Sequence, residues 1–179
     1  MRLLLCLALT VTLLATAPAM ANKAPPLPTG IQAQAVQPLR LLGGATYRKF
    51  GFRVYHAALW VPGARWDAAQ PYALQLTYRR DLSKDTLVDG IMDGIREQEQ
   101  ADDTTLHRWE ATMNAALTDV KEGDSITGLA MPGKSALLFL NGKQIMKIED
   151  KSLSDAFFAV WLGKTADEDM REKLLSQKG

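Results

Sequence analysis

Hydrophobic and polar residues follow two different periods along this chain. From Tyr47 to Val61 the residues are rich in aromatic and β-branched types and alternate with a period of two, which predicts one long strand or a bulged pair of strands. The alternation places Phe52, Val54 and His56 on one face and Arg53 and Tyr55 on the other. Residues 72–80 predict a second strand, and a short apolar run at 39–42 precedes both.

The period then changes to that of a helix. Apolar residues at helical spacing predict one helix that begins after Ser83 and ends near Glu99, and a second that is capped by Asp103 or Thr104. Three short strands at 125–131, 135–140 and 143–148 follow, and Asn141-Gly142 predicts a hairpin between the last two.

The chain closes with two further predicted helices, one from Ser152 and one opened by Thr165 with Glu168 three residues later, the pattern of a capping box. Strands and helices thus occur in segregated runs, which favours an α+β fold with a large, mostly antiparallel sheet packed on one side by helices.

The first residues have the pattern of an export signal. Arg2 precedes an apolar run from Leu3 to about Ala17, and a small-residue site, Ala19-Met20-Ala21, follows it. The alternative, a membrane anchor, needs roughly 20 apolar residues. We therefore expect residues 1–21 to be a signal peptide, 22–38 an extended proline-rich leader and 39–179 the folded domain, with the protein exported to the periplasm and no membrane span left after removal of the signal.

Composition narrows the possible chemistry. Loss of Arg2 with the signal would leave 20 basic and 20 acidic residues, so the mature chain has no overall charge that indicates nucleic acid or an anionic membrane. Cys6 lies inside the signal, which excludes disulfides and thiolate sites from the mature chain. The two histidines lack metal-ligand spacing, so we expect no metal and no cofactor.

The segment GLAMPGKS, residues 128–135, satisfies the phosphate-binding pattern G-x-x-x-x-G-K-[ST]. A P-loop requires a helix after the glycine-rich turn, because the helix N-terminus faces the phosphates. Here the flanking residues predict a strand, a turn and another strand, so we expect a β-turn and no nucleotide.

Polar side chains on the first two long strands are the candidates for a binding site. Arginine is rarely buried without a partner, so an arginine that faces an apolar cavity would bind an anion, and a tyrosine on the same face could donate a hydrogen bond to it. The alternative for each arginine is a solvent-facing position or a pair with an acid such as Asp67 or Asp81.

Five segments together resemble the bacterial chalcone isomerase-like family, from about Leu39 to Leu175. They are GGATYRKFGFRVYHAALWVP, YALQLTYRRDLSKDTLVDG, DVKEGDSITGLAMPG, FLNGKQIMKIED and DAFFAVWLGKTADEDMREKLL. The resemblance implies the open-faced β-sandwich of chalcone isomerases, with a cleft between the sheet and the helical layer. Plant members cyclise chalcones with an arginine that stabilises an enolate-like oxygen, and other members bind fatty acids through an arginine and a tyrosine.

The resemblance places the family's arginine at Arg48, or one position away at Tyr47, and Tyr78 and Arg80 match its Y-x-R piece. The threonine of the plant enzymes aligns with Tyr55 or His56 and is absent. We therefore expect a non-catalytic binder of a small amphipathic anion such as a fatty acid, held by Arg48, Tyr55, Tyr78 and Arg80.

Two alternatives remain open. The first is an intramolecular lyase or isomerase of the chalcone isomerase type, with Arg48, Tyr55 and His56 as candidate catalytic residues. The second is a structural or partner-binding protein of the envelope whose cleft is filled by its own side chains.

Overall fold

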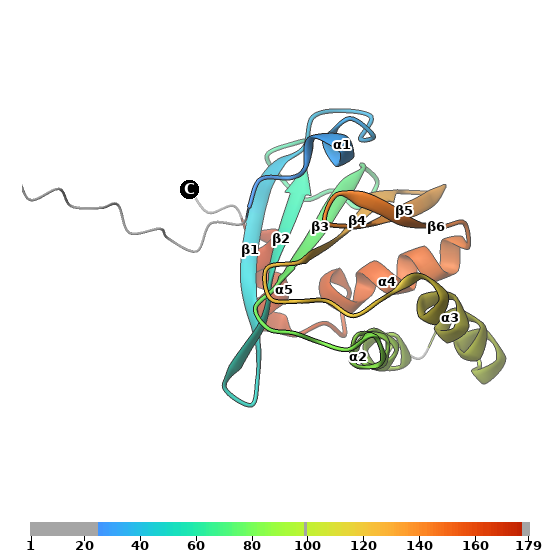
Figure 1. The fold of residues 1–179 in the computed structure, drawn as a ribbon. Helices are drawn as coiled ribbons and strands as arrows, with labels where there is room; N and C mark the ends of the chain where they lie inside the picture. The colour runs from blue at the N-terminus through green and yellow to red at the C-terminus, as the bar shows by residue number, and fades with distance from the viewer. Residues whose placement is uncertain (1–24, 99, 177–179) are drawn as a thin grey trace, which may run out of the picture.

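A six-stranded antiparallel sheet in chain order, β1-β2-β3-β4-β5-β6, forms the centre of the molecule (Figure 1). The computed structural model describes residues 25–98 and 100–176; the expected signal peptide and Cys6 lie outside them. The strands are β1 (Arg40–Lys49), β2 (Phe52–Val61), β3 (Tyr72–Tyr78), β4 (Ser125–Met131), β5 (Ser135–Leu140) and β6 (Lys143–Ile148).

Four helices pack on one face of this sheet: α2 (Lys84–Arg96), α3 (Asp103–Ala116), α4 (Lys151–Leu162) and α5 (Glu168–Leu175) (Figure 1). The α+β class and the one-sided helical layer predicted from the sequence are confirmed. None of the helices in the described part of the chain is long and apolar enough to cross a membrane.

Of the two possibilities predicted for residues 47–61, one long strand or a bulged pair of strands, the structure has the pair, joined as a β-hairpin. Phe50 and Gly51 form its turn, both with positive φ (51° and 81°), and separate β1 from β2. Strand β1 also continues through Gly43 and Gly44, which the apolar pattern alone marks as a break. A Cβ on Gly43 would lie 2.3 Å from the carbonyl oxygen of Lys173, so this glycine lets α5 pack directly on the strand.

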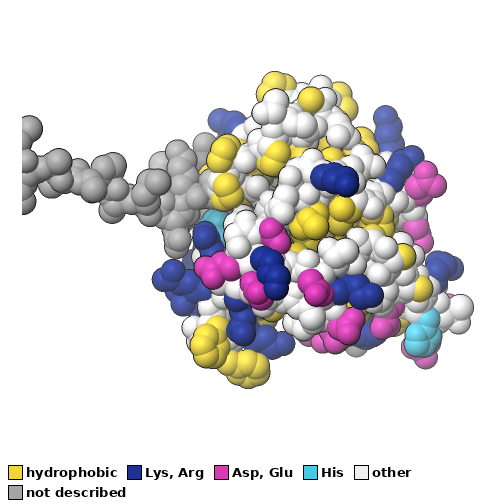
Figure 2. All heavy atoms as spheres, in the orientation of Figure 1, with side chains coloured by type: hydrophobic (Ala, Val, Ile, Leu, Met, Phe, Trp, Pro, Cys, Tyr) yellow, Lys and Arg dark blue, Asp and Glu magenta, His cyan; other side chains and the backbone are white. Residues whose placement is uncertain are grey.

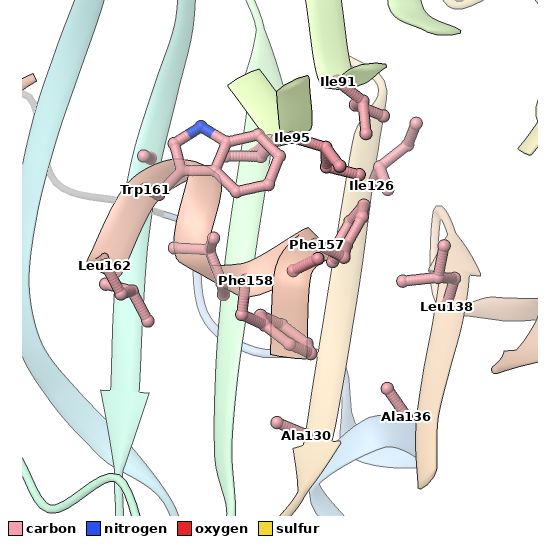
Figure 3. Close-up of a cluster of buried hydrophobic side chains, with 14 of the residues drawn as sticks. Ile91, Ile95, Ile126, Ala130, Ala136, Leu138, Phe157, Phe158, Trp161 and Leu162 are labelled. Carbon is pink, nitrogen blue, oxygen red and sulfur yellow. The ribbon is translucent and has the colours of Figure 1, made fainter. Parts of the chain in front are cut away.

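Helix α4 forms the centre of the core. Its residues Phe157 and Phe158 lie among apolar side chains from the strands and from α2 (Figure 3). A Cβ on Gly128 would lie 2.8 Å from Cε1 of Phe158. The first glycine of GLAMPGKS therefore makes room for a phenylalanine, and the segment forms the end of β4, a turn at Gly133 (φ 76°) and the start of β5, as predicted.

Side-chain caps fix where the helices begin. The Ser83 hydroxyl accepts a hydrogen bond from the backbone N–H of Thr86 and begins α2, as predicted. Asp102 caps α3, one position before the predicted cap, and Asp167 caps α5. The capping box expected at Thr165 is therefore wrong, because the Asp167 carboxylate reaches the free N–H of Met170.

The N-terminal segment covers part of the opposite face of the sheet. It contains a short helix, α1 (Thr29–Gln32), in which Ile31 is fully buried. The expectation of a leader with little structure is wrong for this part, because Ile31 and Leu39 shield apolar side chains on the outer face of β3, β4 and β5: Ala73, Leu129, Leu137 and Phe139.

Candidate functional site

A cleft of about 770 Å³ separates one end of strands β1 to β3 from helices α2, α4 and α5. Its size lies within the roughly 300–1,000 Å³ typical of sites for small organic ligands. The apolar part of its walls comes from the strands and from all three helices: Leu76, Leu87, Ile91, Val160, Trp161 and Met170.

A β-bulge decides which hairpin residues face this cleft. Tyr47 pairs with Tyr55 and Arg48 pairs with Arg53, so Val54 is an extra residue on β2. The bulge reverses the alternation toward the hairpin tip, so Phe52 and Val54 line the cleft together with Tyr55. The sequence-based assignment of Phe52 and Val54 to the opposite face is therefore wrong.

Three tyrosines lie side by side on the cleft face of β1, β2 and β3. Tyr55 is the register partner of both Tyr47 and Tyr78. The rings of Tyr47 and Tyr55 stack with centroids 5.1 Å apart, and Tyr78 meets Tyr55 edge-on at 6.1 Å. These contacts hold the rings as one aromatic wall.

The hydroxyl of Tyr55 has a defined hydrogen-bonding role. Trp161 Nε1 on α4 donates to Tyr55 Oη over 2.9 Å, which leaves the phenolic hydrogen available for another acceptor. Burial raises the pKa of the Tyr55 and Tyr78 hydroxyls well above the ordinary value, so both stay protonated at neutral pH. They can donate a hydrogen bond to an anion in the cleft.

Two cations lie at the end of the cleft nearest the hairpin tip. Lys49 is the register partner of Phe52, and Arg80 Cζ lies 5.6 Å from the centre of the Phe52 ring. Both side chains line the cleft, and among the described residues neither forms a salt bridge.

Carboxylates in the lining are mostly bonded elsewhere. Asp81 accepts from Lys121 Nζ, Asp93 from Arg96 and Asp167 from the start of α5. Glu97 also belongs to the lining. Because Asp81 is held by Lys121, it does not neutralise the adjacent Arg80 through an ion pair.

Three of the predicted site residues meet in the cleft, and two do not. Tyr55, Tyr78 and Arg80 line it. Arg48 is exposed and lies outside the lining, opposite Arg53. His56 is buried outside the cleft lining, where its Nδ1 lies 3.1 Å from Thr46 Oγ1.

Two side chains of the candidate site were missed by the sequence reasoning. Lys49 was predictable in principle, because it lies two residues from Tyr47 and therefore on the same face. Trp161 was only placed in the predicted helix that begins at Ser152, and no local pattern indicates that its ring nitrogen meets Tyr55. No group of three or more potential metal-ligating side chains gathers anywhere in residues 25–98 and 100–176.

Comparisons with known proteins agree with this architecture. Residues 21–176 match the family model described as chalcone isomerase-like. The fold is similar to the crystal structure of a fatty-acid binding protein of Arabidopsis thaliana, with a TM-score of 0.60 and 14% identity over 76% of this chain and 86% of that chain. No curated protein matches the sequence.

Proposed function

Because this chain belongs to the chalcone isomerase-like family, we propose that it is an exported protein that binds a small amphipathic anion, such as a fatty acid, in the cleft between the sheet and the helices. The Arabidopsis protein of similar fold is described as a fatty-acid binding protein. At the low identity between the two chains, that likeness shows the fold, and the proposal depends on the chemistry of the cleft.

The observation that carries the proposal is that an apolar wall and two cations, which form no salt bridge with a described residue, meet in one cleft. Arg80 and Lys49 lie at the hairpin end, and the Tyr55 hydroxyl lies on the sheet wall. Leu76, Ile91 and Val160 supply apolar surface, while the carboxylates of the lining, apart from Glu97, are bonded to other groups. A carboxylate at the cationic end would receive charge-assisted hydrogen bonds, while an acyl chain would be buried against Leu76, Ile91 and the helices.

Arg80 replaces Arg48 as the proposed anion-binding arginine. Arg48 is exposed and lies outside the cleft lining, whereas Arg80 lines it and contacts Phe52. Tyr55 keeps the role expected from the sequence, as the hydrogen-bond donor beside the anion.

Binding is favoured over catalysis by the positions of the proton-transfer candidates. His56 lies outside the cleft and cannot exchange a proton with a ligand there. Tyr55, the other candidate proton donor, has a pKa raised by burial, so it can donate a hydrogen bond but is a weak acid for transferring its proton. The periplasmic location is proposed on the pattern of residues 1–21 alone.

Fluorescent fatty-acid displacement with matched variants tests the proposal. We expect Arg80→Gln to weaken binding about tenfold or more, since a hydrogen bond to a charged group contributes about 1.5–3 kcal/mol. Arg48→Gln is the matched control, with the same chemical change on the outer face, and should leave the affinity unchanged. Shortening the acyl chain by two methylenes should cost about 1.6 kcal/mol, roughly fifteenfold.

Organic extraction of the purified protein followed by mass spectrometry provides an independent test, and we expect a co-purifying acid. An empty extract together with no displaceable binding would refute the proposal. Loss of affinity in Arg48→Gln but not in Arg80→Gln would show that the anion site is wrongly placed.

A further inference from the structure

The tip of the β1–β2 hairpin carries two exposed aromatic side chains. Phe50 is 89% exposed and Phe52 is 64% exposed. The hairpin projects beyond the rest of the sheet (Figure 1), and a hydrophobic patch beside several Lys and Arg side chains lies over its end (Figure 2). Exposing two neighbouring phenylalanines is unfavourable in water, so this patch requires an explanation.

The tip is also locally basic although the chain as a whole is almost neutral. Residues 48–53 read Arg-Lys-Phe-Gly-Phe-Arg and contain three cations and no acid, and Arg80 adds a fourth over the Phe52 ring. Arg48 and Arg53 are register partners on adjacent strands, an unfavourable pairing of like charges. None of these four cations forms a salt bridge with a described residue.

The backbone at the tip provides a separate observation. Phe50 has φ 51°, a left-handed conformation that bulky residues rarely adopt, whereas the other hairpin turn with this geometry uses Asn141. An asparagine or glycine at position 50 would suit the turn better. Because Phe50 is almost fully exposed, its ring does not stabilise the fold in return.

We infer that the hairpin tip docks on an anionic lipid surface. The two phenylalanine rings enter the interfacial region, and Arg48, Lys49 and Arg53 contact lipid phosphates around them. Net charge cannot reveal this site, because it sums over the whole chain while the cations act at one end of it.

Docking at the tip would also place the cleft against the lipid. Phe50, Phe52 and Lys49 belong both to the tip and to the cleft lining. If the proposed function is correct, an acyl ligand could then pass between the bilayer and the cleft without crossing water. The docking itself does not depend on that function.

Vesicle co-sedimentation tests the inference, with phosphatidylglycerol and phosphatidylcholine in equal parts compared with phosphatidylcholine alone. The chain is used from Asn22 onward, because the whole described core lies within residues 31–174 and the apolar segment 3–17 would itself bind lipid. We expect binding to the anionic vesicles that weakens with salt. Arg48→Gln/Arg53→Gln should weaken it on the order of tenfold or more, and Phe50→Ser about tenfold.

Matched controls separate the tip from the rest of the surface. Val36→Ser removes another exposed apolar side chain and Lys134→Gln another exposed cation, and both should bind vesicles like the parent. A fluorophore at Phe50→Cys should shift to the blue on anionic vesicles, and one at Lys134→Cys should not. Circular dichroism verifies that each variant is folded.

The inference is wrong if the parent chain does not bind anionic vesicles or if the tip variants bind them as well as the parent. It is also wrong if the fluorophore at position 50 shows no blue shift on these vesicles. Because Arg48 and Arg53 lie outside the cleft, their double variant should keep its fatty-acid affinity. Failure of docking with intact ligand binding would therefore refute this inference and leave the proposed function standing.

Discussion

Replacing Gly43 by alanine should push α5 away from β1 and destabilise the fold. The added Cβ would lie 2.3 Å and 2.6 Å from the carbonyl oxygens of Lys173 and Leu174, both backbone atoms that no rotamer change can move. The helix must shift by about 1 Å, and overpacking of this kind typically costs about 1–3 kcal/mol. Leu174, which is fully buried, loses packing as the helix shifts, so we expect a loss of about 2–3 kcal/mol in the free energy of unfolding.

Gly90→Ala is the matched control. It makes the same change inside α2, where a Cβ would meet nothing within 4 Å. Alanine is the better helix former, so this variant should gain about 0.5–1 kcal/mol. In thermal unfolding followed by circular dichroism, Gly43→Ala should have a Tm about 5–10 °C below that of the parent, and Gly90→Ala a Tm about 2–3 °C above it.

The prediction is that the two glycine-to-alanine substitutions shift Tm in opposite directions. An unchanged or higher Tm for Gly43→Ala would show that α5 does not contact β1 at this residue. It would also contradict the position of α5 against the sheet, on which the placement of Met170 in the cleft wall depends.

Three further predictions follow from single contacts. Burial raises the pKa of Tyr55 and Tyr78 above the ordinary 10.0, so these tyrosines ionise at lower pH in the unfolded chain than in the folded one. The free energy of unfolding should therefore be unaffected below about pH 10 and should fall above it by up to about 1.4 kcal/mol per pH unit for each tyrosine. Urea denaturation at several alkaline pH values should show this slope, and Tyr55→Phe or Tyr78→Phe should reduce it. The hydrogen bond from Trp109 Nε1, with helix-capping N–H groups, lowers the pKa of Asp150, so the carboxylate stabilises the fold above pH 3.8 and this contribution is lost as the pH falls through the lower folded pKa. Asp150→Ala should cost about 1–2 kcal/mol at pH 7 by urea denaturation, and the cost should shrink as the pH is lowered below 3.8. Asn141→Ala loses a side-chain acceptor at a residue with φ 50°, and the same assay should show a loss of about 2 kcal/mol.

Elements whose signal is local were predictable from the sequence. The Asn141-Gly142 hairpin and the Ser83 cap depend on a few adjacent residues, and the structure confirms both. The bulged pair of strands was one of two possibilities predicted for residues 47–61, but the position of its turn was not predicted. Phenylalanine carries no turn signal, and Phe50 occupies a backbone conformation that sequence statistics assign to other residues.

The candidate site was only partly predictable because it depends on register and on distant segments. Tyr55 and Tyr78 follow from simple alternation, but the bulge at Val54 changes the face of every residue between it and the tip. The contact from Trp161 to Tyr55 joins residues 106 positions apart, and no spacing rule within one element reports it.

The order of the strands gives the protein a modular construction. Every strand pairs with its neighbour in sequence, and the longest connection between two strands of the described sheet, residues 79–124, leaves β3 and returns to β4 after forming α2 and α3. The entropy of closing such a loop grows only slowly with its length. The segment that forms the α2 wall of the cleft can therefore be lengthened, shortened or exchanged while the sheet beneath it keeps its register, so the shape of the cleft can diversify without rebuilding the sheet.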